Sequence, residues 1–315
     1  MRAVMQDPTR TSDVSLVFAT PRKPPRARNL DGRVVVLDLA FASDASGKGF
    51  EKITLPLIEE LGDRLAAWVD HHDHDEHATF RDDPRFVLST KAQHGACPEM
   101  ITPDLVERVG PVDTIVCHTD FDGLASAAKW LRGGSQPYDG CDRDAWAIDT
   151  RLGKPSSVAE TMDRALRARP RDNALFGLIV RHLATGLRDA ALWPAIREAA
   201  DELHAIEVET RKLALAYARL DPGVAVVDIS HRRTRIDKTL LLLIGQERER
   251  IAMIVDRDSI NLATRFDGGI NLLTMLGLSG GMPTRVSVPR KRLPQVCEAL
   301  GLNPDEVESL LVPQP

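Results

Sequence analysis

Residues 114–131 read TIVC-HTDFDG-LASAAKWL, and this stretch indicates how the chain folds. Its first part, Thr114–Cys117, is a short apolar run of the kind that forms a buried strand, and Leu124–Leu131 is typical of a helix. Three side chains able to bind metal stand between them, namely His118, Asp120 and Asp122. A strand that leads directly into a helix is the repeating unit of a parallel α/β sheet, and we expect that fold here.

The same arrangement recurs along the first half of the chain. Three further apolar runs are each followed at once by an acidic residue: Val34–Leu37 by Asp38, Ala66–Val69 by Asp70, and Ala145–Ile148 by Asp149. The carboxyl ends of parallel strands form the ligand crevice of an open α/β sheet. We therefore expect four strands whose polar ends meet at one site.

The second half of the chain predicts a helical connector and a smaller α/β domain. Residues 174–220 have helical character, and Asp221-Pro222-Gly223 is a strong turn signal. Strand and helix signals then alternate again, at Val224–Ile229, Lys238–Gln246, Ile251–Val255 and Leu262–Arg265, before a glycine-rich segment. We predict two domains, residues 1–205 and 206–315.

Composition narrows the range of partners. The chain has 315 residues, a formal net charge of −5 and only 4% aromatic residues. An acidic chain is not a duplex-DNA binder of the basic type, so an anionic substrate must be attracted locally. Few aromatic residues make an extended base-stacking groove unexpected.

Compartment signals are few. The cysteines at 97, 117, 141 and 297 form no CxxC pair, which favours reduced thiols over a disulfide framework or a thiolate zinc site. No apolar run is long enough to span a membrane, and the first residues lack the apolar core of a signal peptide. We expect a cytoplasmic protein with no membrane segment.

Two motifs carry most of the chemical signal. The tract Val69–Asp75, with Asp70, His71 and His72 at its start, can ligate metal and bind phosphate, or it can be a solvated loop; we weigh the two equally. In the second motif, residues 118–123, an extended chain would point its His and two Asp the same way. A capped helix start is the alternative explanation of this motif; it would account for the two aspartates but not for the histidine.

Together these residues resemble the DHH phosphoesterase superfamily, which includes single-strand-specific exonucleases, oligoribonucleases, cyclic-dinucleotide phosphodiesterases and family II inorganic pyrophosphatases. The similar stretches are the triplet Asp70-His71-His72, the segment His118–Gly123, Asp38, Asp149-Thr150 and the turn Gln93–Glu99. The resemblance covers roughly residues 33–155 and its motifs are jointly specific.

The chain departs from the family in the order of its motifs, because here the triplet precedes the D-x-D-G motif. A permuted strand order would bring the same groups together, since a site depends on geometry and not on chain order. The roles of Asp38 and Asp149 can be exchanged on this basis. The family's C-terminal glycine-rich segment resembles residues 277–285, with Met282 in the place of a histidine.

The resemblance implies a two-ion hydrolytic centre with Mn²⁺ or Mg²⁺. One ion would take Asp38, His118 and Asp120, and the other would take His71, Asp122 and Asp149, with Asp38 shared. The ions would activate water for attack on phosphorus. His72 is the candidate to contact the phosphate or protonate the leaving oxygen, and Asp70 would orient the site. Substrate contacts would come from Arg265, Arg285 and the backbone of Gly280 and Gly281, although a turn with exposed arginines explains these residues equally well.

The expected activity is hydrolysis of phosphodiester bonds in short oligonucleotides or in linear or cyclic dinucleotides. The same superfamily offers an alternative, an inorganic pyrophosphatase or a nucleotide bisphosphate phosphatase. Two alternatives lie outside hydrolysis: a nucleotide-binding regulatory protein without turnover, and a general metal-binding protein built on His71, His72, His74 and His77. The sequence leaves the oligomeric state open, and a homodimer is compatible with it.

Overall fold

The computed structural model describes residues 10–11, 14–46 and 48–311, which form two compact units. One unit holds the chain up to Phe41 and residues 50–203, and the other holds residues 42–49 and 204–315. The expected boundary near residue 205 lies in helix α7 (Trp193–Leu213), where the chain passes from the first unit to the second. Residues 1–9, for which a signal peptide was not expected, lie outside the described residues.

The sheet of the first unit has the strand order β1-β2-β6-β3-β4-β5 among the described residues. The neighbouring pairs β2–β6, β6–β3, β3–β4 and β4–β5 are parallel, and β1 is antiparallel to β2. Parallel strands are covered on both faces, so their sequences are continuously apolar, as in the fully buried VVVL of β3. The bounds are β1 Arg10–Thr11, β2 Val14–Ala19, β3 Val34–Leu37, β4 Leu65–Asp70, β5 Phe86–Leu88 and β6 Thr114–His118.

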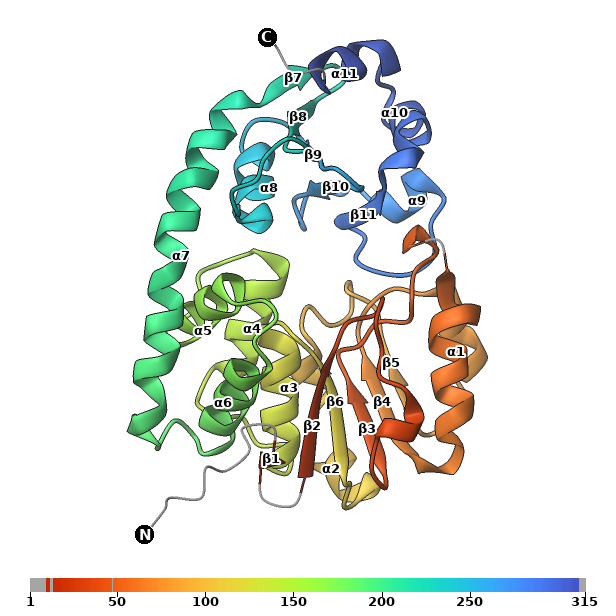
Figure 1. The fold of residues 1–315 in the computed structure, drawn as a ribbon. Coiled ribbons are helices and arrows are strands. Elements are labelled where there is room, and N and C mark those ends of the chain that lie inside the picture. The colour runs from red at the N-terminus through yellow and green to blue at the C-terminus, as the bar shows by residue number, and fades with distance from the viewer. Residues whose placement is uncertain (1–9, 12–13, 47, 312–315) are drawn as a thin grey trace. The chain divides into compact units, whose positions relative to one another are not determined.

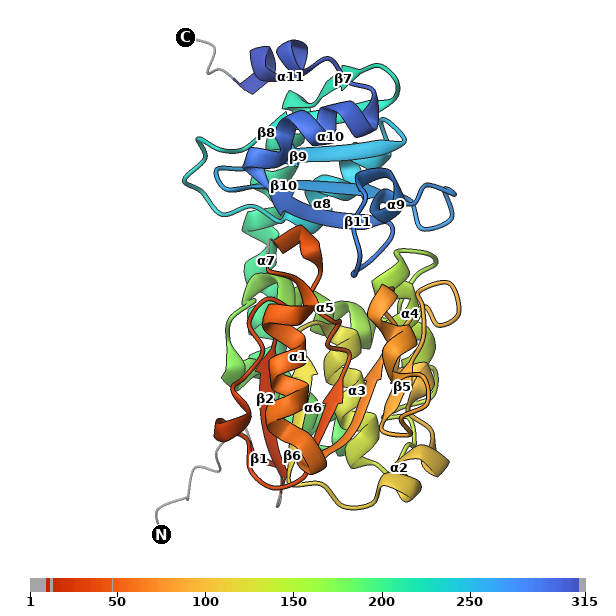
Figure 2. The same cartoon turned by 90° about the vertical axis from the view of Figure 1, so that its right-hand side faces the viewer.

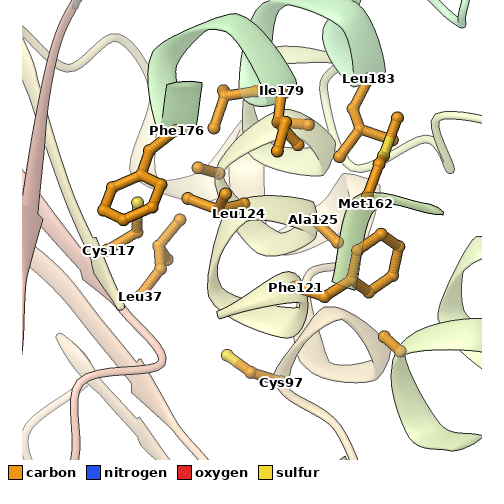
Figure 3. Packing of buried hydrophobic residues seen from close by; sticks show 14 of the residues in the cluster. Leu37, Cys97, Cys117, Phe121, Leu124, Ala125, Met162, Phe176, Ile179 and Leu183 are labelled. Atoms are coloured by element: carbon orange, nitrogen blue, oxygen red, sulfur yellow. The ribbon is translucent and has the colours of Figure 1, made fainter. Parts of the chain in front are cut away.

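Helices cover both faces of this sheet (Figures 1 and 2). Successive residues of a strand point to opposite faces of the sheet. Leu37 therefore packs against residues of α3 and α6 on one face, and its neighbour Val36 packs with residues of α1 on the other. Figure 3 shows Leu37 and Cys117 close to Phe121, Leu124 and Phe176 of those helices. The helix bounds are α1 Gly49–Leu61, α2 Pro103–Val109, α3 Phe121–Leu131, α4 Cys141–Thr150, α5 Ser157–Ala168 and α6 Asn173–Ala184.

One predicted strand is wrong. Residues 145–148 belong to helix α4 and not to a strand that ends at Asp149. A short apolar run is compatible with a buried strand or a buried helical turn, and here Asp142 and Asp144 in the first turn favour the helix. The ends of three strands, the start of helix α3 and helix α4 therefore supply the polar groups.

Three other local predictions need correction. The chain at His118–Asp122 is not extended, because β6 ends at His118 and Asp120 caps helix α3. The helical stretch from 174 to 220 is interrupted between α6 and α7 and ends in strand β7. The helical spacing of residues 53–65 predicts one helix over that range, but α1 ends at Leu61 and Leu65 already begins β4.

The second unit is a mixed α/β layer. Its sheet has the order β11-β10-β9-β8-β7, in which only β8 and β9 pair in parallel among the described strands. Helix α8 packs on one face, and α9, α10 and α11 pack on the other together with Ala45 from the segment 42–49. The bounds are β7 Ala218–Leu220, β8 Val224–Asp228, α8 Lys238–Gln246, β9 Ile251–Val255, β10 Ser259–Thr264, α9 Leu272–Leu276, β11 Arg285–Pro289, α10 Leu293–Leu300 and α11 Pro304–Leu311.

The two-domain α/β architecture expected from the sequence is confirmed, with a mainly parallel sheet first and a smaller mixed sheet second. Within the described part of the chain, no helix is both long enough and apolar enough to cross a lipid bilayer.

Candidate metal centre

Asp38 lies at the centre of the polar residues that follow the parallel strands. It comes directly after β3, is 1% exposed and has a φ of 56°, in the left-handed region that few residues other than glycine adopt. Its backbone N–H donates to Val69 O at 2.9 Å, which holds this unusual turn against β4. Neither carboxylate oxygen accepts a hydrogen bond of good geometry from the described residues. A buried carboxylate without such a partner is costly unless a cation compensates it.

The triplet after β4 divides into two parts with different surroundings. His71 is fully buried, and its Nε2 lies 3.2 Å from Asp38 Oδ1 and 3.3 Å from Asp122 Oδ2. The Nδ1 of His72 lies 2.8 Å from Asp70 Oδ1, so His72 donates to a buried carboxylate that fixes its ring. Asp70 is thus a positioning group, and the second nitrogen of His72 remains for other contacts.

The motif after β6 bends around the start of helix α3. His118 Nδ1 lies 2.9 Å from Asp120 Oδ2 and 3.6 Å from Asp38 Oδ2. Asp120 Oδ1 accepts from Gly123 N at 3.2 Å as the N-cap of the helix, so capping and a ligand role coexist in one side chain. Asp122, in the first turn of the helix, is buried, and its Oδ2 faces His71.

Asp149 reaches the same cluster from helix α4. Its Oδ2 lies 3.8 Å from His71 Nε2 and forms an ion pair with Lys91 Nζ. Lys91, in the turn after β5, is 2% exposed, and its Nζ lies 2.8 Å from His71 Nε2. The sequence did not point to Lys91, because one lysine in a polar loop carries no motif and β5 itself was not predicted.

A backbone turn holds the cluster from behind. The carbonyl of His94 lies 2.8 Å from His71 Nδ1, and the N–H of Cys97 donates to Asp122 Oδ2 at 3.2 Å. A neutral His71 ring that donates from Nδ1 to this carbonyl would present the lone pair of Nε2 to a cation. This turn leads into the short 3-10 helix Cys97–Met100, at the place where a small-residue turn was expected.

The donor atoms gather in three overlapping groups, within each of which they lie no more than 4.8 Å apart: Asp38, His71 and His72; Asp38, His118 and Asp120; and His71, Asp122 and Asp149. The structure thus brings together all six residues predicted as metal ligands, together with Asp70 and His72. Buried atoms in these groups lack hydrogen-bond partners among the described residues, including both oxygens of Asp38 and one of Asp122. Oxygen and imidazole donors of this kind fit Mn²⁺ or Mg²⁺.

Electrostatics also favour a bound cation. Burial, and then the neighbouring charge of Asp38, raise the pKa of Asp122 to about 7. Burial, and then the charge of Lys91, lower the pKa of His72, so its ring is neutral near pH 7. Burial also raises the pKa values of the Cys97 and Cys117 thiols well above their usual range, so neither supplies a thiolate ligand.

The substrate-contact residues predicted in the second unit lie in or beside the segment from the end of β10 to the start of β11. Arg265, just after β10, is exposed and pairs with Asp267, its Nη2 lying 2.9 Å from Oδ2. Arg285 begins β11 and donates to Thr239 Oγ1 at 3.3 Å. Gly280 and Gly281 have φ values of 88° and 117°, which suit a glycine turn. These contacts fit the turn interpretation and leave the substrate role a prediction.

Two histidines of the tract after β4 do not join the cluster. His74 and His77 lie 5.5 and 5.0 Å from the ring of Phe41, measured between ring centroids, and neither belongs to a donor group among the described residues. The alternative of a metal site built on His71, His72, His74 and His77 therefore has no support from the geometry.

No family model and no curated protein matches this chain. Among solved structures, it is similar to the pGpG-specific phosphodiesterase PggH from Vibrio cholerae, at 10% identity and a TM-score of 0.41, over 89% of this chain and 99% of the other. It is also similar to the exonuclease RecJ bound to manganese, at 13% identity and a TM-score of 0.39, over 90% of this chain and 94% of the other.

Proposed function

We propose that this chain is a divalent-metal-dependent phosphoesterase that hydrolyses phosphodiester bonds in short oligonucleotides or dinucleotides, in the cytoplasm. One observation carries the proposal: the buried carboxylate of Asp38, without a hydrogen-bond partner among the described residues, stands between His71 and His118, each at the end of a neighbouring parallel strand. The resemblance of the motifs to DHH phosphoesterases adds to it.

The residues divide the work as follows. Asp38, His118 and Asp120 would hold a Mn²⁺ or Mg²⁺ ion, and His71, Asp122 and Asp149 offer a second position. A bound divalent ion supplies Lewis-acid activation of water and of the phosphoryl oxygens. The family resemblance implies two ions. The number of ions bound per chain can be measured independently of activity.

His72 is the proposed proton carrier. Asp70 holds its Nδ1–H at 2.8 Å, and the neutral ring presents Nε2 as an acceptor. In the proposed reaction a water oxygen bonds to phosphorus while the bond from phosphorus to the leaving oxygen breaks. The water proton passes to His72 Nε2 and from there to the leaving oxygen, so His72 ends the reaction neutral.

Composition supports a short substrate over a long one. The chain carries a net charge of −5, so extended polyanions are repelled except where cations gather. Substrate contacts in the second unit are proposed for Arg265 and Arg285, whose guanidinium groups can grip phosphate at two points, and for the backbone of Gly280 and Gly281.

The decisive experiment compares the wild type with Asp120→Asn in Mn²⁺. Asparagine keeps a cap oxygen for Gly123 N and removes the ligand charge, so helix α3 is retained. We expect the hydrolysis rate of a linear dinucleotide to fall by about 10³-fold or more. The matched control is Asp82→Asn, in an exposed turn outside the donor groups, which should keep full activity. Equal rates in the wild type and Asp120→Asn would remove the proposed site.

A substrate panel separates the alternatives. Pyrophosphate, a nucleotide bisphosphate, linear and cyclic dinucleotides and a longer single strand are offered under the same conditions. Preference for pyrophosphate or for the bisphosphate would favour those phosphatase activities. Binding of a dinucleotide without turnover, in a protein that also binds Mn²⁺, would favour the regulatory alternative.

A further inference from the structure

Lys91 lies inside the second group of metal donors. Its side chain is 2% exposed, although lysine is rarely buried without a partner. The amine forms an ion pair with Asp149 and lies 2.8 Å from His71 Nε2. Two of the three residues of the group His71, Asp122 and Asp149 therefore already contact a cation that belongs to the chain itself.

A divalent ion and this amine cannot share the position. The Nδ1 of His71 is committed to the carbonyl of His94, so only Nε2 faces the cluster. An imidazole nitrogen has one lone pair, which either accepts an N–H from Lys91 or binds an ion. Oxygen ligands lie about 2.0–2.1 Å from Mg²⁺, so an ion held by both His71 and Asp149 would overlap the ammonium group.

The charge balance favours retention of the ammonium. Lysine is ordinarily an ammonium, and in this buried site it forms an ion pair with the carboxylate of Asp149. By contrast, the group Asp38, His118 and Asp120 pairs with no lysine or arginine within 4 Å among the described residues. The two positions thus differ: the ammonium of Lys91 lies in one of them, and no lysine or arginine of the described residues lies in the other.

We propose that the ammonium of Lys91 takes the place of a second divalent ion, so that the chain holds one ion, at Asp38, His118 and Asp120. Lys91 then offsets one of the two negative charges of Asp122 and Asp149, and its ammonium lies beside the ion, where a substrate phosphate would bind. This inference rests on one part of the proposed function, namely that the chain binds a divalent ion. It does not depend on hydrolysis. It makes Lys91 a substrate-contacting residue that no motif pointed to.

The test is the number of Mn²⁺ ions bound per chain, measured by calorimetric titration and by elemental analysis of the desalted protein. We expect one ion in the wild type and two in Lys91→Met, which keeps a linear apolar stem and frees the position. The matched control is Lys52→Met, on the exposed side of α1, with one ion. Two ions in the wild type, or one in a folded Lys91→Met protein, would overturn the proposal.

A second variant covers the case in which Lys91→Met does not fold. The double change Lys91→Met with Asp149→Asn removes one charge of each sign, so the buried cluster keeps its balance, and it also removes a ligand of the second position. We expect this protein to bind one ion, and two ions would contradict the assignment of Asp149. Absence of hydrolysis together with one ion in the wild type and two in Lys91→Met would reject the proposed function and leave this inference intact. Hydrolysis together with two ions in the wild type would support the proposed function and reject this inference.

Discussion

Gly95 packs so closely against Trp146 that a Cβ atom on Gly95 would lie 2.1 Å from Trp146 Cδ1. The two residues belong to the parts of the chain that approach His71 from different sides. Gly95 follows His94, whose carbonyl holds the ring, and Trp146 precedes Asp149 by one turn of α4. The absence of a side chain at position 95 is therefore a condition for the cluster to close.

Gly95→Ala should lower both stability and activity. The added methyl group must push the turn and helix α4 apart, and overpacking of this kind costs about 1–3 kcal/mol. We expect a lower melting temperature and at least a tenfold slower hydrolysis. Trp146→Ala in the same chain removes the ring that meets the methyl group, so Gly95→Ala should cost less stability and activity in that background than in the wild type. Additive losses in the double variant would show that the two residues do not act through this contact.

Asp38→Asn should stabilise the metal-free protein while it abolishes activity. The change removes a buried negative charge without a hydrogen-bond partner, and asparagine tolerates the left-handed backbone at this position. In EDTA we expect the free energy of unfolding to rise by about 1–2 kcal/mol. Thermal unfolding in EDTA and the hydrolysis rate in Mn²⁺ check the two halves separately. A less stable Asp38→Asn protein would mean that the carboxylate is satisfied without an ion.

Metal binding should raise the stability of the wild type in a way that Asp120→Asn abolishes. A ligand at about 100 times its dissociation constant stabilises the native state by about 2.7 kcal/mol. The wild type should therefore unfold several degrees higher in excess Mn²⁺ than in EDTA, and Asp120→Asn should unfold at one temperature in both. The same upward shift in both proteins would place the ion away from Asp120.

Asp70 should make stability fall at low pH. Burial by itself raises its pKa, but the charge and hydrogen bond of His72 lower it to about 2, below its ordinary value of 3.8. A depressed pKa in the native state contributes stability above about pH 4 that is lost as the pH falls toward 2, here roughly 2 kcal/mol. Urea unfolding in EDTA between pH 6 and pH 3 should show a shallower decline for Asp70→Asn than for the wild type. Asp82→Asn should follow the wild type.

The sequence predicted the parts of the site that sit on strands. The runs before Asp38, Asp70 and His118 are continuously apolar because these strands are covered on both faces, and this pattern predicted all three strands. The expectation that polar groups at neighbouring strand ends meet then followed from the parallel sheet. Asp149 was predicted for the wrong reason, because it reaches the cluster from a helix.

The contacts that the sequence could not predict are made by backbone atoms or by residues far apart in the chain. The carbonyl of His94 and the N–H of Cys97 hold the two buried ligands, but a backbone group leaves no mark on the amino-acid sequence. Lys91 meets Asp149 across 58 positions of the chain, and nothing near either residue announces the other. Periodicity reports burial of local elements, so contacts of this kind need coordinates.

The segment 42–49 has a consequence for how the protein can be divided. Because it leaves the first unit after Phe41, adds Ala45 to the core of the second unit and returns at Phe50, the chain crosses between the units three times. A fragment that begins at residue 204 would lack Ala45, which belongs to the core of the second unit. A fragment that ends at residue 203 would carry the segment 42–49 without the unit against which it packs. Evolution or engineering that exchanges the second unit for another must therefore replace two separate stretches of the gene at once.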